Sequence, residues 1–124
     1  MEESDALTHE IIGAAIEVHR ELGPGLLESV YEVCLSCELE MRGIDHERQF
    51  PLPVVYKGRL LDADFRLDIY LPNRLVVELK AVERLLPVHE AQLLTYLRLT
   101  RTRVGLLMNF NVPVLKDGIK RMVL

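Results

Sequence analysis

The sequence predicts an α/β fold of the α+β kind, in which helices flank a mixed central sheet. Two segments with apolar residues at steps of three and four open the chain, and the alternating or continuously apolar runs typical of strands follow. A later helical segment separates two strands, which gives the order α-α-β-β-β-α-β-(β). A chain of 124 residues favours one domain over residues 1–124, because two domains would each bury too little apolar surface.

Two helices are predicted before the first strand. The first covers residues 5–22, where apolar side chains form one stripe, and Gly23-Pro24-Gly25 ends it. The second runs from about residue 27 to 42, and Gly43 is a typical C-terminal glycine. One face of this helix carries Leu27, Val30, Tyr31, Cys34, Cys37 and Met41. Core packing is therefore predicted for both cysteines, because a redox Cys-x-x-Cys motif normally opens a helix.

The hydrophobic period then changes to that of strands. Residues 44–56 are predicted to hold one or two strands with prolines at an edge or bulge, and Lys57-Gly58 is a predicted turn. In residues 65–71 the side chains alternate, and residues 75–80 are typical of a central strand. The alternation places Phe65, Leu67, Ile69 and Leu71 on one face and Arg66, Asp68 and Tyr70 on the other.

The last third of the chain is predicted to add a helix and up to two strands. Pro87 suits the first position of a helix, and the apolar pattern after it supports about three turns. Residues 103–110 are typical of a buried strand, and residues 118–124 favour a final one. A mixed sheet with helices on its faces follows from this order of elements.

The overall charge and the apolar runs exclude some classes of protein. A formal net charge of −4 and a pI near 5.6 argue against coating nucleic acid through bulk positive charge. They are compatible with an enzyme, because a cation site gathers acidic side chains. No apolar run is long enough to span a bilayer, and the acidic start lacks the features of a secretory signal. No membrane partner and a cytoplasmic location are therefore expected.

Charged residues in the predicted central strand indicate a chemical site. Glu78 and Lys80 break an apolar run at a spacing of two, so they project from the same face. If Leu71 faces Leu75 across a hairpin, Asp68 lies opposite Glu78 with Cβ atoms about 4.5–5.5 Å apart. Two carboxylates placed so repel each other unless a cation lies between them, and oxygen ligands suit Mg²⁺ or Mn²⁺.

A simpler interpretation of these three residues is a Glu–Lys ion pair on a half-exposed strand with Asp68 in a turn. Burial of the flanking residues argues against it, because buried charges need a partner or an ion. In the metal-site interpretation, Lys80 orients or deprotonates a water molecule, or stabilises charge on a phosphate.

Asp68, then Glu78-Leu79-Lys80, and a following helix with Gln92 and Tyr96 resemble the PD-(D/E)XK nuclease superfamily. The resemblance implies a restriction-endonuclease-like core of a helix, a three-stranded meander, a helix and a strand. It also implies that Asp68 and Glu78 bind Mg²⁺ together with the backbone carbonyl of Leu79. Lys80 would then lie beside the attacking water.

A narrower resemblance covers nearly the whole chain. Residues 25–31 fit the Gly-x-x-Glu-x-x-Tyr signature of the small bacterial GxxExxY family. Four further stretches look like that family, and they are residues 18–25, 77–83, 87–96 and 104–110. The resemblance implies that Glu28 completes the metal site or holds a metal-bound water. It also implies that Gln92 orients the active site and that Tyr96 approaches a phosphate.

Several polar residues have structural alternatives. Gln92 and Tyr96 lie one helical turn apart and can instead cap the core with satisfied polar groups. Packing or a structural hydrogen bond is favoured for His19 and His89, with His89 at most a neighbour of the metal ligands. Arg66 either neutralises Asp68 or binds phosphate. The exposed end of the third helix best explains the basic run Arg98, Arg101 and Arg103.

The predicted function is a Mg²⁺-dependent nuclease, with Mn²⁺ as a substitute, that hydrolyses phosphodiester bonds of nucleic acid, DNA being favoured. The alternative is a nucleic-acid- or protein-binding module that retains the fold without turnover, for which the small size and the acidic net charge argue. A homodimer or a partner protein is compatible with either function.

Overall fold

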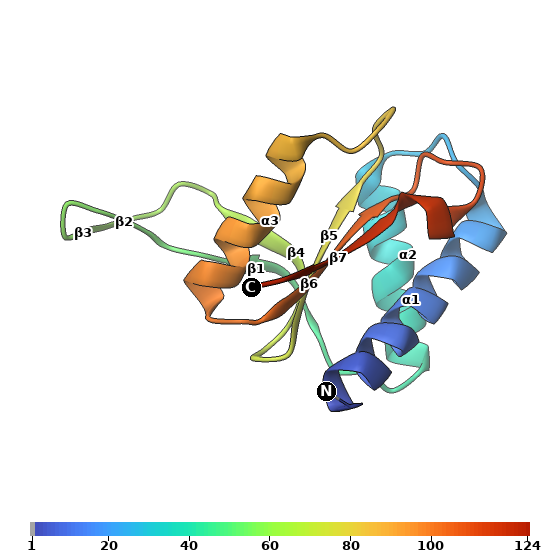
Figure 1. Cartoon of the computed structure of the whole chain (residues 1–124), viewed down its shortest axis with the longest axis horizontal. Coiled ribbons are helices and arrows are strands. Elements are labelled where there is room, and N and C mark those ends of the chain that lie inside the picture. Colours follow the sequence, from blue (N-terminus) through green and yellow to red (C-terminus); the bar gives the residue numbers. More distant parts are fainter. Residues whose placement is uncertain (1) are drawn as a thin grey trace.

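The computed structural model describes the backbone of residues 2–124 and the side chains from Asp5 onward. A mixed sheet forms the middle layer, with α1 and α2 on one face and α3 on the other (Figure 1). The helices are α1 (Glu2–Leu22), α2 (Glu28–Met41), α3 (Pro87–Thr100) and the short 3-10 helix η1 (Leu115–Gly118). The strands are β1 (Glu47–Pro51), β2 (Val54–Tyr56), β3 (Arg59–Leu61), β4 (Arg66–Leu71), β5 (Leu75–Lys80), β6 (Val104–Asn109) and β7 (Ile119–Val123).

The five-stranded sheet has the order β1-β4-β5-β6-β7. All neighbours are antiparallel except β5 and β6, which are parallel because α3 carries the chain from one to the other. The predicted α+β class with a mixed, helix-flanked sheet is therefore confirmed. No helix among residues 2–124 has the length and apolar character needed to cross a membrane.

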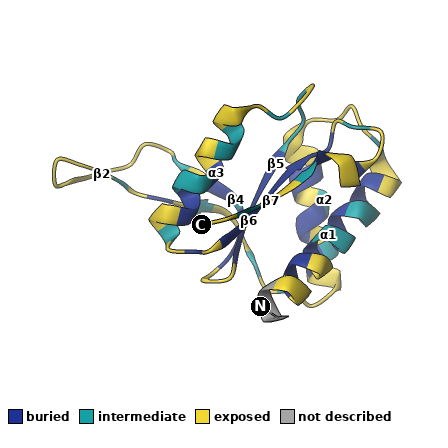
Figure 2. Ribbon diagram, in the orientation of Figure 1, coloured by how far each residue is buried: buried dark blue, intermediate teal, exposed yellow. Residues whose placement is uncertain are grey.

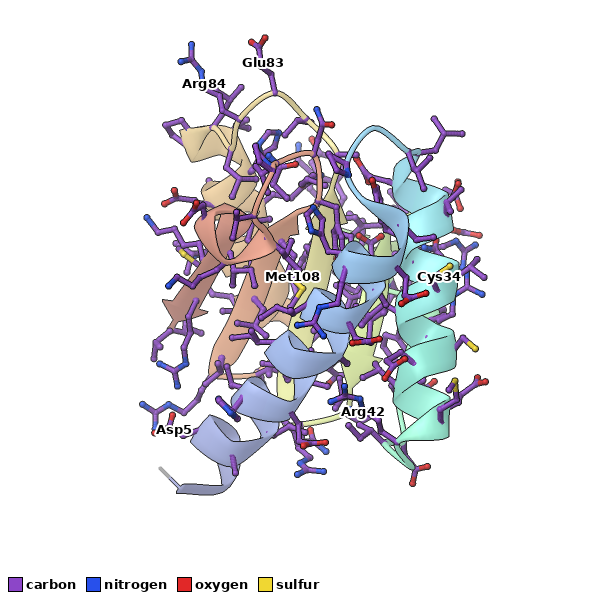
Figure 3. All side chains as sticks on the ribbon, turned by 90° about the vertical axis from the view of Figure 1, so that its right-hand side faces the viewer. Asp5, Cys34, Arg42, Glu83, Arg84 and Met108 are labelled. Carbon is purple, nitrogen blue, oxygen red and sulfur yellow. The ribbon has the colours of Figure 1, made fainter. Side chains whose placement is uncertain are left out.

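Two hydrophobic cores hold the layers together. The larger one lies between the sheet and the α1–α2 pair, and Figure 3 shows Met108 of β6 behind α1 in this layer. Its helical contributions include Ile11 and Val18, which confirms the apolar stripe predicted for the first helix. The smaller core lies between the sheet and α3 and contains Tyr96 and Leu97. The central strands β5 and β6 are therefore covered on both faces, as their apolar runs predict.

The face predicted for the second helix is only partly right, since Tyr31 is buried and Cys34 packs against the core but the other predicted residues are exposed. The buried residues of α2 are Tyr31, Glu32, Leu35, Ser36 and Leu39, whereas Leu27 and Met41 are 73% and 75% exposed. Cys37 is exposed and Cys34 only half-buried, so the core packing predicted for both cysteines is also wrong for Cys37. The predicted and the observed stripes of α2 share Tyr31 and then follow different sides of the helix. The stripe that packs in the core contains Leu35 and Leu39.

The alternation predicted for β4 is also wrong. Ile69 and Leu71 face α1 and α2, but Phe65 and Leu67 pack in the core beneath α3. The pairing between β1 and β4 skips the position of Asp68, where Gln49 on β1 has a left-handed φ of 51°. The side chains of β4 change faces beside this interruption of the ladder, and irregular residues in a strand pair commonly redirect side chains.

Residues 44–61 contain more strand than the sequence predicts. The edge strand β1 ends at Pro51, which fits the predicted edge position of the prolines. Strand β2 pairs with β3, which was not predicted, through the expected turn at Lys57-Gly58. Both turn residues have positive φ, at 50° and 79°, as two-residue hairpin turns require. The β2–β3 hairpin forms a separate two-stranded sheet.

Replacing Gly118 with alanine is expected to destabilise the fold by about 2–3 kcal/mol. A Cβ atom at this position would overlap the backbone carbonyl oxygen of Asn109, which cannot rotate away. Urea unfolding measures the loss. Gly13→Ala is the matched control, because Gly13 lies inside α1 and a Cβ there would lie 3.4 Å from the flexible side chain of Arg42. This variant should gain stability, since alanine favours helix more than glycine does. Equal stabilities of Gly118→Ala and the unmodified protein would contradict the predicted clash.

Candidate active site

Asp68 and Glu78 meet where the backbone ladder between β4 and β5 ends. The predicted hairpin register is confirmed, since Leu71 pairs with Leu75 and the ladder continues to Ile69 with Val77. At the next position, that of Asp68 and Glu78, side-chain carboxylates accept the backbone N–H groups in place of backbone carbonyls. The Asp68 N–H donates to Glu78 Oε2 at 3.1 Å, and the Leu79 N–H donates to Asp68 Oδ2 at 2.9 Å. Each carboxylate is thus fixed by the neighbouring strand.

The electrostatics of this pair favour protonation when no cation is present. Burial and the charge of Asp68 raise the pKa of Glu78 well above its ordinary value, and only 4% of the residue is exposed. Burial also raises the pKa of Asp68, and the Glu28 carboxylate raises it further, against the lowering effect of the Leu79 N–H. The interaction between the two carboxyl groups lowers the pKa of Asp68 and raises that of Glu78. A bound cation would relieve this repulsion.

Lys80 and α3 complete one side of the site. Strand alternation puts Lys80 on the same face as Glu78, and its charge lowers the pKa of both carboxyl groups. Lys80 Nζ makes a long hydrogen bond of 3.5 Å to Gln92 Oε1 on α3. Burial and the two carboxylates raise the pKa of Tyr96 to about 12, so its hydroxyl remains a donor at neutral pH. The structure therefore brings Lys80, Gln92 and Tyr96 to the carboxylate pair.

Glu28 approaches the pair from the other side, at the start of α2. It is exposed, yet its carboxylate acts electrostatically on Asp68. Tyr31, three residues on, holds the preceding loop: its hydroxyl donates to the Gly23 carbonyl at 2.6 Å and accepts from the Leu26 N–H at 3.1 Å. Gly25 in this loop has a φ of 98°, which favours glycine. In the Gly-x-x-Glu-x-x-Tyr segment, Gly25 and Tyr31 thus fix the helix start that presents Glu28.

Two neighbouring polar residues were not singled out from the sequence. Glu32 is buried, binds Arg48 and Gln49 on β1, and its pKa is raised chiefly by burial. Asn109 at the end of β6 is 2% exposed. Its Oδ1 accepts the Val82 N–H at 3.0 Å, and its Nδ2 donates to the Val82 carbonyl at 2.9 Å. These bonds fix the loop after Lys80. In the sequence, Glu32 could have been recognised as a polar residue on an apolar helix face, and Asn109 as a polar residue at the end of a strand.

The remaining candidates have structural partners. His19 Nε2 lies 2.8 Å from the carbonyl oxygen of Val112, and His89 Nδ1 accepts the Leu86 N–H at the start of α3. The packing and hydrogen-bonding role favoured for both histidines is therefore confirmed. Arg66 pairs with Asp64 at 2.9 Å rather than with Asp68. Arg98, Arg101 and Arg103 are exposed, as predicted for a solvated helix end.

The donor set fits a hard divalent cation. Among the described side chains, no group of three or more His, Cys, Asp and Glu residues is arranged to hold a metal ion. Two adjacent carboxylates are nevertheless sufficient for Mg²⁺, which usually takes one or two carboxylates and completes its shell with water and substrate phosphates. Burial and the neighbouring Asp68 raise the pKa of Glu78, and a cation bound beside the pair would lower it.

The comparisons with known proteins agree with this geometry. A family model described as the PD-(D/E)XK nuclease superfamily matches residues 5–122. No curated protein and no solved structure gives a significant match. The matched range contains α2, α3 and nearly all of α1 and the mixed sheet, together with the pair of Asp68 and Glu78 and Lys80 beside it. The chain therefore belongs to the PD-(D/E)XK nuclease superfamily.

Proposed function

We propose that the protein is a Mg²⁺-dependent nuclease that hydrolyses phosphodiester bonds of DNA. The observation that carries this proposal is the buried contact between Asp68 and Glu78, with Lys80 on the same face of β5. Without a cation this contact costs stability, because both carboxylates are desolvated and repel each other. Superfamily membership, with its nucleic-acid substrates, supports the same function.

Each residue has a proposed role. Asp68 and Glu78 would hold the ion together with the Leu79 carbonyl, and Glu28 would complete its shell or hold a water molecule bound to it. The ion supplies charge neutralisation at the scissile phosphate and a more acidic water. Lys80 orients the attacking water and stabilises negative charge on the phosphoryl oxygens, while Gln92 holds the Lys80 ammonium. Tyr96 donates a hydrogen bond toward a phosphate oxygen.

The proposal extends to the narrower family, the natural ion, the location and the partners of the protein. Membership of the narrower GxxExxY family is supported by the positive φ of Gly25 and the hydrogen bond of the Tyr31 hydroxyl to Gly23. Both fix the start of α2, from which Glu28 acts on Asp68. Mg²⁺ as the natural ion is supported by the all-oxygen donor set, with Mn²⁺ as a substitute. A cytoplasmic location and a homodimer or partner protein stay predictions.

The direct test is incubation of the protein with supercoiled plasmid, linear duplex, single-stranded DNA and RNA. We expect cleavage of DNA with Mg²⁺ or Mn²⁺ and none after chelation. A preparation of Glu78→Ala purified in parallel excludes a contaminating nuclease. Failure to cleave any substrate, combined with nucleic-acid binding that Glu78→Gln leaves unchanged, would instead assign the chain as a binding module without turnover.

A further inference from the structure

The β2–β3 hairpin, residues 54–61, projects away from the body of the molecule (Figure 1) and is called the arm below. Both of its faces are exposed, as the colouring in Figure 2 shows. Val55 and Leu60 are a cross-strand pair that is 65% and 71% exposed, and the neighbouring Tyr56 is 59% exposed. A two-stranded hairpin with no covered face is at best marginally stable in water, so the arm is expected to gain stability from a partner.

The base of the arm is tied to the candidate active site. The Leu52 N–H donates to the Phe65 carbonyl at 2.7 Å, which closes the hairpin at its base. The Phe65 ring then packs on Tyr96 with a centroid distance of 5.0 Å. Tyr96 lies one helical turn from Gln92, which accepts a hydrogen bond from Lys80 at 3.5 Å, so α3 links the base of the arm to the candidate site. A ligand bound along the arm would therefore reach the site.

The formal net charge of −4 conceals a strong separation of charge. Residues 1–46, which form α1 and α2, carry eleven Asp and Glu against two Arg, a formal charge of −9. Residues 47–124, which form the sheet, α3 and the arm, carry eight Asp and Glu against thirteen Lys and Arg, a formal charge of +5. In Figure 1 the arm and α3 lie on the side of the sheet away from α1 and α2. The acidic helices α1 and α2 thus disfavour a polyanion on their side of the sheet, whereas the arm and α3 lie on the other side.

The charged residues of the arm itself are both cations. They are Lys57 at the turn, with Nζ 5.5 Å from the centre of the Tyr56 ring, and Arg59. Among the described side chains neither makes an ion pair, whereas the nearby Arg66 is paired with Asp64. The arm therefore presents two uncompensated positive charges beside apolar side chains at its exposed end.

We propose that the arm is a duplex-DNA-binding element that enters the major groove beside the active site. This inference rests on the proposed nuclease function and names double-stranded DNA as its substrate class. A two-stranded ribbon fits the B-DNA major groove, which is about 12 Å wide, while the major groove of duplex RNA is too deep and narrow. Lys57 and Arg59 bind phosphates on the groove walls, and Val55 and Leu60 contact base edges such as thymine methyl groups.

The test variant removes both charges and keeps the hairpin. Lys57→Asn creates an Asn-Gly turn, the preferred sequence for two central residues with positive φ, and Arg59→Gln keeps a long polar side chain. The matched control removes two exposed cations from the region opposite the arm, through Arg20→Gln and Lys116→Gln. Thermal melting establishes that both double variants fold.

Binding is measured by fluorescence anisotropy with a labelled DNA duplex of about two helical turns, in EDTA so that no cleavage occurs. We expect the arm variant to bind about tenfold or more weakly near 0.1 M salt, and its salt dependence of log K to fall by about 1.8, or 0.9 per lost phosphate contact. The control and the affinity for duplex RNA should stay unchanged. Unchanged DNA binding by the arm variant, or equal losses in both double variants, would overturn the proposal.

Two further measurements separate DNA binding by the arm from the nuclease proposal and from dimerisation through the arm. Hydrolysis of bis(p-nitrophenyl) phosphate with Mn²⁺ should be the same in the arm variant and the unmodified protein, because a small ester does not reach the arm. If the unmodified protein cleaves neither the ester nor DNA but the arm variant still loses DNA binding, the nuclease proposal fails and the arm proposal holds. Light scattering gives the mass of each variant, and a dimer that the arm substitutions dissociate would assign the arm to a second copy and refute DNA binding.

Discussion

Replacing Lys80 with alanine is expected to slow metal-dependent phosphodiester hydrolysis by about 100- to 1,000-fold, the usual loss when one group that stabilises transition-state charge is removed. Lys80 is the ammonium on the Glu78 face of β5, and Gln92 on α3 holds it at 3.5 Å. Single-turnover cleavage of plasmid or a labelled duplex with saturating Mg²⁺ measures this step without product release.

Lys116→Ala is the matched control, because Lys116 is exposed on η1, the 3-10 helix that packs beside α1, away from the carboxylate pair. Its activity should equal that of the unmodified protein. Gln92→Ala should give a smaller loss, because Lys80 stays charged but loses its orienting acceptor. Full activity in Lys80→Ala would show that the cleaving group lies elsewhere and would refute the proposed site.

The meeting of Asp68 and Glu78 could be predicted from the sequence because it depends on short-range geometry. Once Leu71 is set opposite Leu75, strand periodicity alone brings Asp68 to Glu78 and puts Lys80 on the same face. The three intervening residues of the tight connection leave few other registers. The register and the mixed sheet are both confirmed, while the catalytic roles of these residues remain predictions.

The features that the sequence did not reveal depend on contacts between distant segments. Two stripes of α2 are apolar enough to be buried, and the choice of Leu35 and Leu39 over Val30 and Met41 is made by the sheet beneath them. The burial and pairing of Glu32 depend on Arg48 and Gln49 of β1, which are distant from it in the sequence. No local pattern predicts the positive φ of Gln49 or the change of buried face in the neighbouring β4.

Glu78→Gln is expected to raise the metal-free melting temperature at neutral pH by several degrees. Glu78 must either stay charged in a buried site or bind a proton there, at a cost of about 1–3 kcal/mol that glutamine avoids. Glutamine has the same shape, and its Oε1 can still accept the Asp68 N–H. The folded pKa of Glu78 lies above its unfolded value, so its contribution to stability is fully present below about pH 4 and is lost as the pH rises through the folded pKa. The two proteins should therefore melt together near pH 4 and diverge toward pH 8.

A divalent ion should reverse this order in the unmodified protein alone. Binding at a hundred times the dissociation constant stabilises a folded protein by about 2.7 kcal/mol, so Mn²⁺ should raise the melting temperature at pH 8. Glu78→Gln should show little rise, because one of the two proposed carboxylate ligands is lost. Glu40→Gln, on the exposed side of α2, controls for the loss of a negative charge and should keep both the pH profile and the response to Mn²⁺. A rise with Mn²⁺ that is equal in all three proteins would place the ion elsewhere. An unmodified protein that gains stability relative to Glu78→Gln as the pH rises would mean that Glu78 already has a positive partner, and the need for a cation at this pair would disappear.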